Sequence, residues 1–108
     1  MNRRDYLIYE INVDGMFYIG CWAVDEYGPA KSLNRRLRQA IQKAKNFRAG
    51  RADHRKLFEA IRNCFDESTI TIRQLELLPN VTKELALHLE SEYIKSVPDY
   101  LSLNTYKM

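Results

Sequence analysis

This sequence of 108 residues has no long hydrophobic run, few cysteines and no low-complexity tract. No stretch approaches the roughly 20 consecutive apolar residues of a membrane-spanning helix, and the N-terminus lacks the apolar core of a signal peptide. We therefore expect no membrane partner and a cytoplasmic protein. Cys21 and Cys64 have no close Cys or His neighbours, which argues against a zinc site, and we expect both thiols to be reduced and structural.

Internal repeats and Gly/Ser/Pro linkers are also missing, so we expect one folded domain over residues 1–108. Hydrophobic residues make up 45% and charged residues 29% of the chain, which excludes intrinsic disorder and fibrous classes. The net charge is only +3, but it is distributed unevenly. Between Lys31 and Arg62 there are 11 Lys or Arg and two acids, a local charge of +9. Such a face suits nucleic acid, although a solvated helical surface is the alternative.

Hydrophobic periodicity and turn residues predict an α+β domain, a small antiparallel sheet of about three strands flanked by helices in the order ββααβα. Asp14-Gly15 predicts a tight hairpin turn, Pro79-Asn80 is expected to end the third strand, and Pro98 to stop the last helix. The expected elements are strands over Tyr6–Val13, Met16–Trp22 and Thr69–Leu78, a helix capped by Ser32 and reaching Phe47, helices over His54–Phe65 and Lys83–Val97, the latter capped by Thr82, and an extended tail over Tyr100–Met108.

The predicted hairpin brings two tyrosines together. A turn at Asp14-Gly15 places Tyr9 opposite Gly20 and Ile11 opposite Tyr18 on one face. Glycine inside a strand is costly unless something approaches the backbone closely, so Gly20 leaves an open space beside Tyr9. The chain has seven tyrosines, and ordinary strand preference also accounts for these two.

One carboxylate and one arginine lie at unusual positions on the predicted helices. Glu90 falls within the apolar arc of the last helix, where a carboxylate must be paired, protonated or bound to a metal. An ion pair with an arginine is the structural alternative. Arg36 is expected at the rim of the first helix, where a guanidinium suits a phosphate, although rim arginines often only snorkel. The apolar arc that contains Glu90 consists of Leu85, Ala86, Leu87, Leu89, Tyr93, Ile94 and Val97.

These residues carry a family resemblance. Leu7-Ile8-Tyr9, followed after eight residues by Tyr18-Ile19-Gly20, resembles the paired signature of the GIY-YIG nucleases. The order of the remaining features is similar too and covers nearly the whole chain: an arginine on the next helix (Arg36), a histidine at the start of the second (His54), a strand, a glutamate four residues before an isoleucine (Glu90, Ile94) and an asparagine in the tail (Asn104).

The resemblance implies a nuclease domain that cleaves DNA with one divalent cation, Mg²⁺ or Mn²⁺, and without a covalent intermediate. It also implies a bacterial or phage-infected cell, and a homodimer or a recruiting protein partner. The implied roles are metal ligand for Glu90, activation or orientation of water for Tyr9, support of Tyr9 for Tyr18, charge stabilisation for Arg36 and bracing for Asn104. His54 belongs to the set less closely, and a surface position beside Arg55 and Lys56 is the alternative.

Two departures from the family pattern leave choices open. Leu7 stands where the family usually has glycine, and the loop from Cys21 to Arg35 is longer than is common, so Arg35 or Arg38 is an alternative to Arg36. Trp22 and Tyr27 can pack this loop or stack on a base, and His88 is expected to be solvated.

The basic segment is expected to follow the DNA backbone through Arg35, Arg38, Lys43, Arg48, Arg51, Arg55 and Lys56. Two other functions fit the sequence. The first is a non-cleaving nucleic-acid-binding module on the same scaffold. The second is a protein-interaction or inhibitor domain in which Glu90 is only ion-paired. RNA as a substrate stays open.

Overall fold

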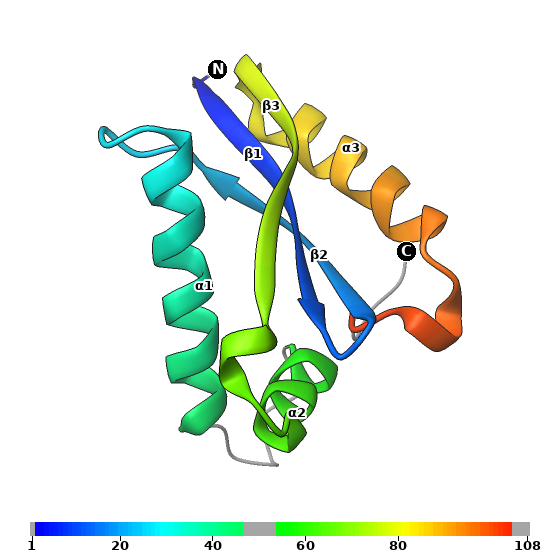
Figure 1. The fold of residues 1–108 in the computed structure, drawn as a ribbon. Helices are drawn as coiled ribbons and strands as arrows, with labels where there is room; N and C mark the ends of the chain where they lie inside the picture. Colours follow the sequence, from blue (N-terminus) through cyan, green and yellow to red (C-terminus); the bar gives the residue numbers. More distant parts are fainter. Residues whose placement is uncertain (1, 47–53, 105–108) are drawn as a thin grey trace.

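The structure, a computed structural model, describes residues 2–46 and 54–104 and has the predicted α+β architecture in the order ββααβα (Figure 1). Two short 3-10 turns complete it. The elements are β1 (Arg3–Val13), β2 (Met16–Ala23), α1 (Pro29–Lys45), α2 (Arg55–Asn63), η1 (Glu67–Thr69), β3 (Thr71–Thr82), α3 (Lys83–Ser96) and η2 (Asp99–Leu101).

One antiparallel sheet has the strand order β2-β1-β3, so β1 is central and β2 is an edge strand. The hairpin register is the predicted one, with Tyr9 opposite Gly20 and Ile11 opposite Tyr18. At the turn Asp14 and Gly15 both have positive φ, 54° and 81°, as the tight hairpin requires.

Helices cover both faces of the sheet, α1 and α2 one face and α3 the other (Figure 1). Tyr9, Ile11 and Val13 pack with α1 and α2, whereas Ile8 and Ile19 pack with α3. The period of β1 predicted a half-buried strand. Its centre is instead buried on both faces, because α3 folds back over the second one.

The first helix begins earlier than predicted. Ser32 is not its N-cap, because the helix starts at Pro29 behind Gly28, which has a φ of 90°. Proline is favoured at the first helical position, where its missing N–H is not needed. The Ser32 hydroxyl is buried, donates to the Gly28 carbonyl at 2.9 Å and accepts the Asp25 N–H at 3.3 Å.

The third strand runs past the residues that were expected to end it. It begins at Thr71 and continues through Pro79 and Asn80 to Thr82. The pairing with β1 shifts by one residue there, and Asn80 has a φ of 51°, so the two residues form a β-bulge. An edge strand tolerates a proline, and the Asp5 carboxylate accepts the Asn80 N–H at 2.9 Å.

The last helix follows the prediction at its start and differs on its apolar face. Thr82 caps it, accepting the Leu85 N–H at 3.3 Å. Leu85 and Leu87, placed in the apolar arc, are 45% and 44% exposed, because the sheet covers only the side of α3 that carries Ala86 and Ile94.

The remaining segments show two further differences. The second helix ends at Asn63 and starts after His54. The tail is not fully extended, since η2 precedes a stretch in which the Leu103 N–H donates to the Phe17 carbonyl at 2.7 Å. Within residues 2–46 and 54–104, no helix is long and apolar enough to cross a membrane.

Candidate functional site

Five of the six predicted site residues line one cleft of about 280 Å³. They come from β1, β2, α1, the start of α2 and α3: Tyr9, Tyr18, Arg36, His54 and Glu90. The cleft also contains Cys21, Trp22, Lys43 and Phe58. Residues separated by up to 81 positions in the sequence therefore meet beside the edge strand β2.

The Tyr9 ring lies directly over Gly20. A Cβ added at Gly20 would collide with Cζ and Oη of Tyr9 and would lie 2.7 Å from its Cε2. The open space predicted beside Tyr9 is therefore filled by the Tyr9 ring itself. Because Gly20 lets the ring cross β2, the Tyr9 hydroxyl reaches Arg36, and it accepts a hydrogen bond from Nε at 2.7 Å.

Arg36 is buried rather than at the rim where the helical projection placed it, with 5% of its surface exposed. Its guanidinium lies 5.3 Å from the Trp22 ring centroid and 5.8 Å from that of Tyr9, and these rings cover it. Nη1 is buried without a hydrogen-bond partner, and no described carboxylate forms a salt bridge with Arg36. A buried cation in this state is a strong site for an anion.

The geometry also decides between the three neighbouring arginines. Arg35 forms a salt bridge with Asp25 at 2.7 Å and is half exposed, and Arg38 is on the solvent side of α1. Only Arg36 contacts Tyr9 and lines the cleft. Of the three arginines, Arg36 is therefore the one that lies beside the predicted tyrosines.

The second tyrosine pairs with the histidine. Tyr18 Oη and His54 Nδ1 are 3.2 Å apart, and their rings meet edge to face at 5.6 Å. His54 has a φ of 57°, a left-handed conformation that costs a non-glycine residue about 1–2 kcal/mol. The residue is exposed, as the surface alternative proposed, yet its ring lines the cleft.

Glu90 is half-buried at the side of the cleft formed by α3. Loss of solvent raises the pKa of its carboxyl above the usual value. Within the described residues it has no hydrogen bond and no salt bridge, so the ion pair that was its structural alternative is not seen. Burial is the main cause that raises the pKa values of Tyr9, Tyr18 and Cys21, and the nearby charge of Glu90 raises them further.

Asn104 lies outside the cleft lining and holds its edge strand in place. Its side-chain Oδ1 accepts the Ile19 N–H at 3.0 Å, and its Nδ2 donates to the Ile19 carbonyl at 2.9 Å. The amide thus occupies the position of a neighbouring strand on the outer side of β2. Ile19 lies between Tyr18 and Gly20, so this contact fixes the strand at the site, which agrees with a bracing role.

Both tyrosines are protonated at neutral pH, because the ordinary pKa of a phenol is about 10 and burial raises it further. Burial raises the pKa of Tyr9, and the opposing effect of the Arg36 charge is only partial. Burial and the neighbouring Tyr9 raise the pKa of Tyr18 as well. Each phenol is therefore a neutral hydrogen-bonding group in the cleft.

The predicted DNA-contacting residues are in several places. Lys43 is in the cleft itself, whereas Arg35 and Arg38 line a separate surface hollow. Arg55 forms an exposed salt bridge with Glu59 at 3.0 Å, and Lys56 is exposed. The predictions for Arg48 and Arg51 lie outside the described residues.

Sequence reasoning named Lys43 only as a contact to the DNA backbone and gave Trp22 no function, and it placed neither beside the predicted catalytic residues. Lys43 is seven residues after Arg36, a spacing that places both on one face of α1. Trp22 alternates with Tyr18 and Gly20 on β2, so it shares their face. The helical spacing alone could have placed Lys43 beside Arg36, and the strand alternation alone could have placed Trp22 beside Tyr18.

Comparison with known proteins gives no relative for this chain. No protein-family model, no curated protein and no solved structure matches it. A functional argument for this chain therefore depends on the cleft.

Proposed function

We propose that this protein is an endonuclease of the GIY-YIG type that hydrolyses DNA phosphodiester bonds with the help of one Mg²⁺ or Mn²⁺ ion. One observation carries the proposal. Among the described residues, no carboxylate forms a salt bridge with the buried Arg36 guanidinium and no cation forms one with the half-buried Glu90 carboxylate, and both lie in the cleft beside two protonated tyrosines. A phosphate would balance the positive charge of the guanidinium, and a divalent cation would balance the negative charge of the carboxylate.

The charged residues divide the work on the substrate. Arg36 lines the cleft, and its guanidinium stabilises the negative charge that grows on the phosphate in the transition state. Lys43, two turns further along the same helix face, adds positive charge at the cleft. These groups hold the scissile phosphate against the edge of β2.

The tyrosines place the nucleophile. Tyr9 accepts from Arg36, which leaves its own hydroxyl proton available to orient a water beside the phosphate. Tyr18 and His54 form a pair that holds Tyr18 in position and gives a route for a proton through Nδ1. Since water is the nucleophile, no protein group becomes covalently attached.

The donor set fits a hydrated magnesium ion. Glu90 is the residue that would hold it, and among the described residues no group of three or more His, Cys, Asp or Glu side chains can bind a metal. Mg²⁺ is commonly held by one or two carboxylates together with waters and substrate phosphate, so a single free carboxylate is sufficient. Bound there, the ion would supply Lewis acidity at the phosphate and lower the pKa of a coordinated water.

Partner and location follow from the substrate. We propose DNA as the partner, contacted through the basic residues of α1 and the start of α2, and a cytoplasmic site of action where DNA is accessible. A cleft in one small chain contacts few bases. Site selection would therefore come from a homodimer or a recruiting protein.

The test is nicking of supercoiled plasmid by purified protein with Mg²⁺ or with EDTA. Wild type should convert the plasmid to nicked or linear forms only with the metal. Glu90→Gln should abolish this, and Tyr9→Phe should slow it about 100-fold. Glu92→Gln, an exposed carboxylate two residues away on α3, is the matched control and should cut at the wild-type rate.

Each rival function has a distinct signature in the same assay. Retardation of the plasmid by wild type and variants alike, with no cutting under any metal, would identify a binding module. No retardation at low salt would point to a protein-interaction domain.

A further inference from the structure

Two surface hollows lie near the cleft, beside the N-terminal half of α1. The first, about 350 Å³, is lined by Arg4, Trp22, Ala23, Asp25 and Arg35. It shares Trp22 with the cleft. The second, about 520 Å³, is lined by Tyr27, Lys31, Asn34, Arg35 and Arg38, and it shares Arg35 with the first. Each depression thus shares one lining side chain with the next, and we call this series of three, from the cleft to the solvent side of the helix, the path.

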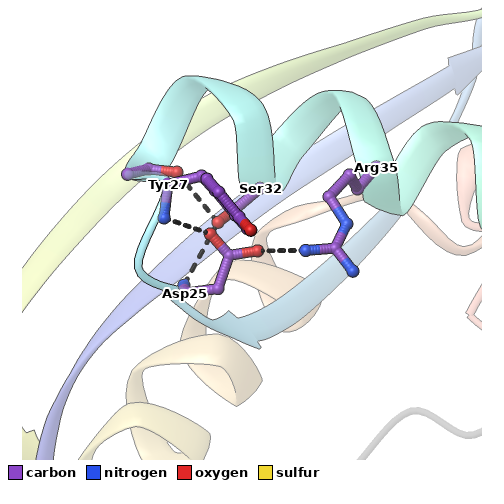
Figure 2. A network of polar contacts seen from close by, with 5 residues as sticks. Asp25, Tyr27, Ser32 and Arg35 are labelled. Atoms are coloured by element: carbon purple, nitrogen blue, oxygen red, sulfur yellow. Dashed lines mark hydrogen bonds and ion pairs between the residues drawn. The ribbon is translucent and has the colours of Figure 1, made fainter.

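The path is basic along its length. Lys31, Arg35 and Arg38 are spaced four and three residues apart, which puts them on one face of α1. Asp25 is the acidic residue in the lining of the two outer hollows, and its carboxylate forms a salt bridge with Arg35 at 2.7 Å (Figure 2). The path therefore has a net positive charge and suits a chain of phosphates.

An exposed aromatic residue lies at the far end of the path. Tyr27 is 59% exposed, and Lys31 Nζ lies 5.8 Å from its ring centroid. Two hydrogen bonds hold the loop that carries Tyr27 in place. The Asp25 carboxylate accepts the Tyr27 N–H at 2.9 Å, and the backbone N–H of Asp25 donates to Ser32 Oγ (Figure 2). A fixed, solvent-facing aromatic beside a cation is the arrangement on which a nucleic-acid base stacks.

The shape of the path selects the kind of nucleic acid. Arg36 lines the cleft and Arg35 lines both outer hollows, and consecutive helical residues point about 100° apart. A strand following the path must turn around the start of α1. Duplex DNA is too stiff to do this, since its persistence length is about 150 base pairs, whereas a single strand bends freely.

We propose that the Tyr27 hollow binds an unpaired DNA strand that leaves the cleft, with a base stacked on Tyr27 and phosphates on Lys31, Arg35 and Arg38. The substrate class is then a duplex with a single-stranded arm beside the scissile phosphate. The part of this inference that rests on the proposed function is that the strand comes from a scissile phosphate in the cleft. The binding site itself does not depend on catalysis.

The test measures binding in EDTA, where no cutting occurs, by fluorescence anisotropy. The probes are a blunt duplex and two armed duplexes, in which a short oligothymidylate arm extends from the 5′ end or from the 3′ end of one strand. Wild type should prefer one armed duplex. Tyr27→Ala should weaken binding of that probe about tenfold and leave the blunt duplex unchanged, and Tyr27→Phe should bind like wild type. Tyr100→Ala removes an aromatic that is 78% exposed, on η2, and should change neither affinity.

Several results would overturn the proposal. Equal wild-type affinity for armed and blunt duplexes refutes the single-strand preference. An unchanged affinity in Tyr27→Ala, or an equal loss in Tyr100→Ala, refutes the stacking site. The thermal unfolding midpoint of Tyr27→Ala checks that the variant is folded, which its exposed position predicts. If plasmid is never cut but the armed probe still distinguishes Tyr27→Ala, the nuclease proposal fails and the single-strand site stands.

Discussion

Replacement of Gly20 by alanine should disrupt the site from beneath Tyr9. The added Cβ would lie 2.7 Å from Tyr9 Cε2 and closer still to Cζ and Oη, and the ring is 1% exposed. Overpacking by a methyl group costs about 1–3 kcal/mol. If the ring rotates away, the charged hydrogen bond from Arg36 Nε is lost as well, worth about 1.5–3 kcal/mol.

The backbone effect has the opposite sign. Alanine loses less conformational entropy than glycine in a strand, a gain of about 0.5–1 kcal/mol. The net expectation for Gly20→Ala is a loss of about 2–5 kcal/mol in the free energy of unfolding, measured by urea denaturation. Plasmid nicking should fall at least as far as in Tyr9→Phe, because both changes remove the Tyr9 hydroxyl from its place.

A double-mutant cycle tests whether the clash with the Tyr9 ring causes this loss of stability. In a Tyr9→Ala background the clash cannot occur, so adding Gly20→Ala should stabilise the protein by about 0.5–1 kcal/mol instead of destabilising it. An equal destabilisation by Gly20→Ala in both backgrounds would refute the ring-over-glycine argument. A Gly20→Ala protein as stable and as active as wild type would refute it too.

Two further predictions concern the edge of β2. Asn104→Ala should lower the free energy of unfolding by about 1–3 kcal/mol, since both Ile19 backbone groups lose their partner, and exposed Asn34→Ala is the control. A loss no larger than in Asn34→Ala would contradict this. Burial and the nearby Glu90 charge raise the pKa of Cys21 to about 11, so in metal-free Cys64→Ser protein iodoacetamide should react slowly at pH 8. Glu90→Gln should accelerate that reaction, and an unchanged rate would contradict the closeness of the two groups.

Local rules were sufficient for much of the fold. The Asp14-Gly15 turn and the Thr82 cap depend on neighbours within a few positions, and both were predicted correctly. The same rules gave the facing of Tyr9 and Gly20, because a hairpin register follows from its turn. Where a local rule failed, a second one competed. Pro29 started the helix before Ser32, and an edge bulge accommodated Pro79.

The sequence by itself therefore determined the element order, the hairpin and which residue types were candidates for chemistry. Tertiary structure alone decided that Arg36 is buried under Tyr9 and Trp22, that Glu90 reaches the same cleft from the opposite face of the sheet, and that Asn104 bonds to Ile19. The physical reason is range. Turns, caps and periodicity act between neighbouring residues, whereas these contacts join positions 14 to 85 residues apart and exist only once the helices have packed on the sheet.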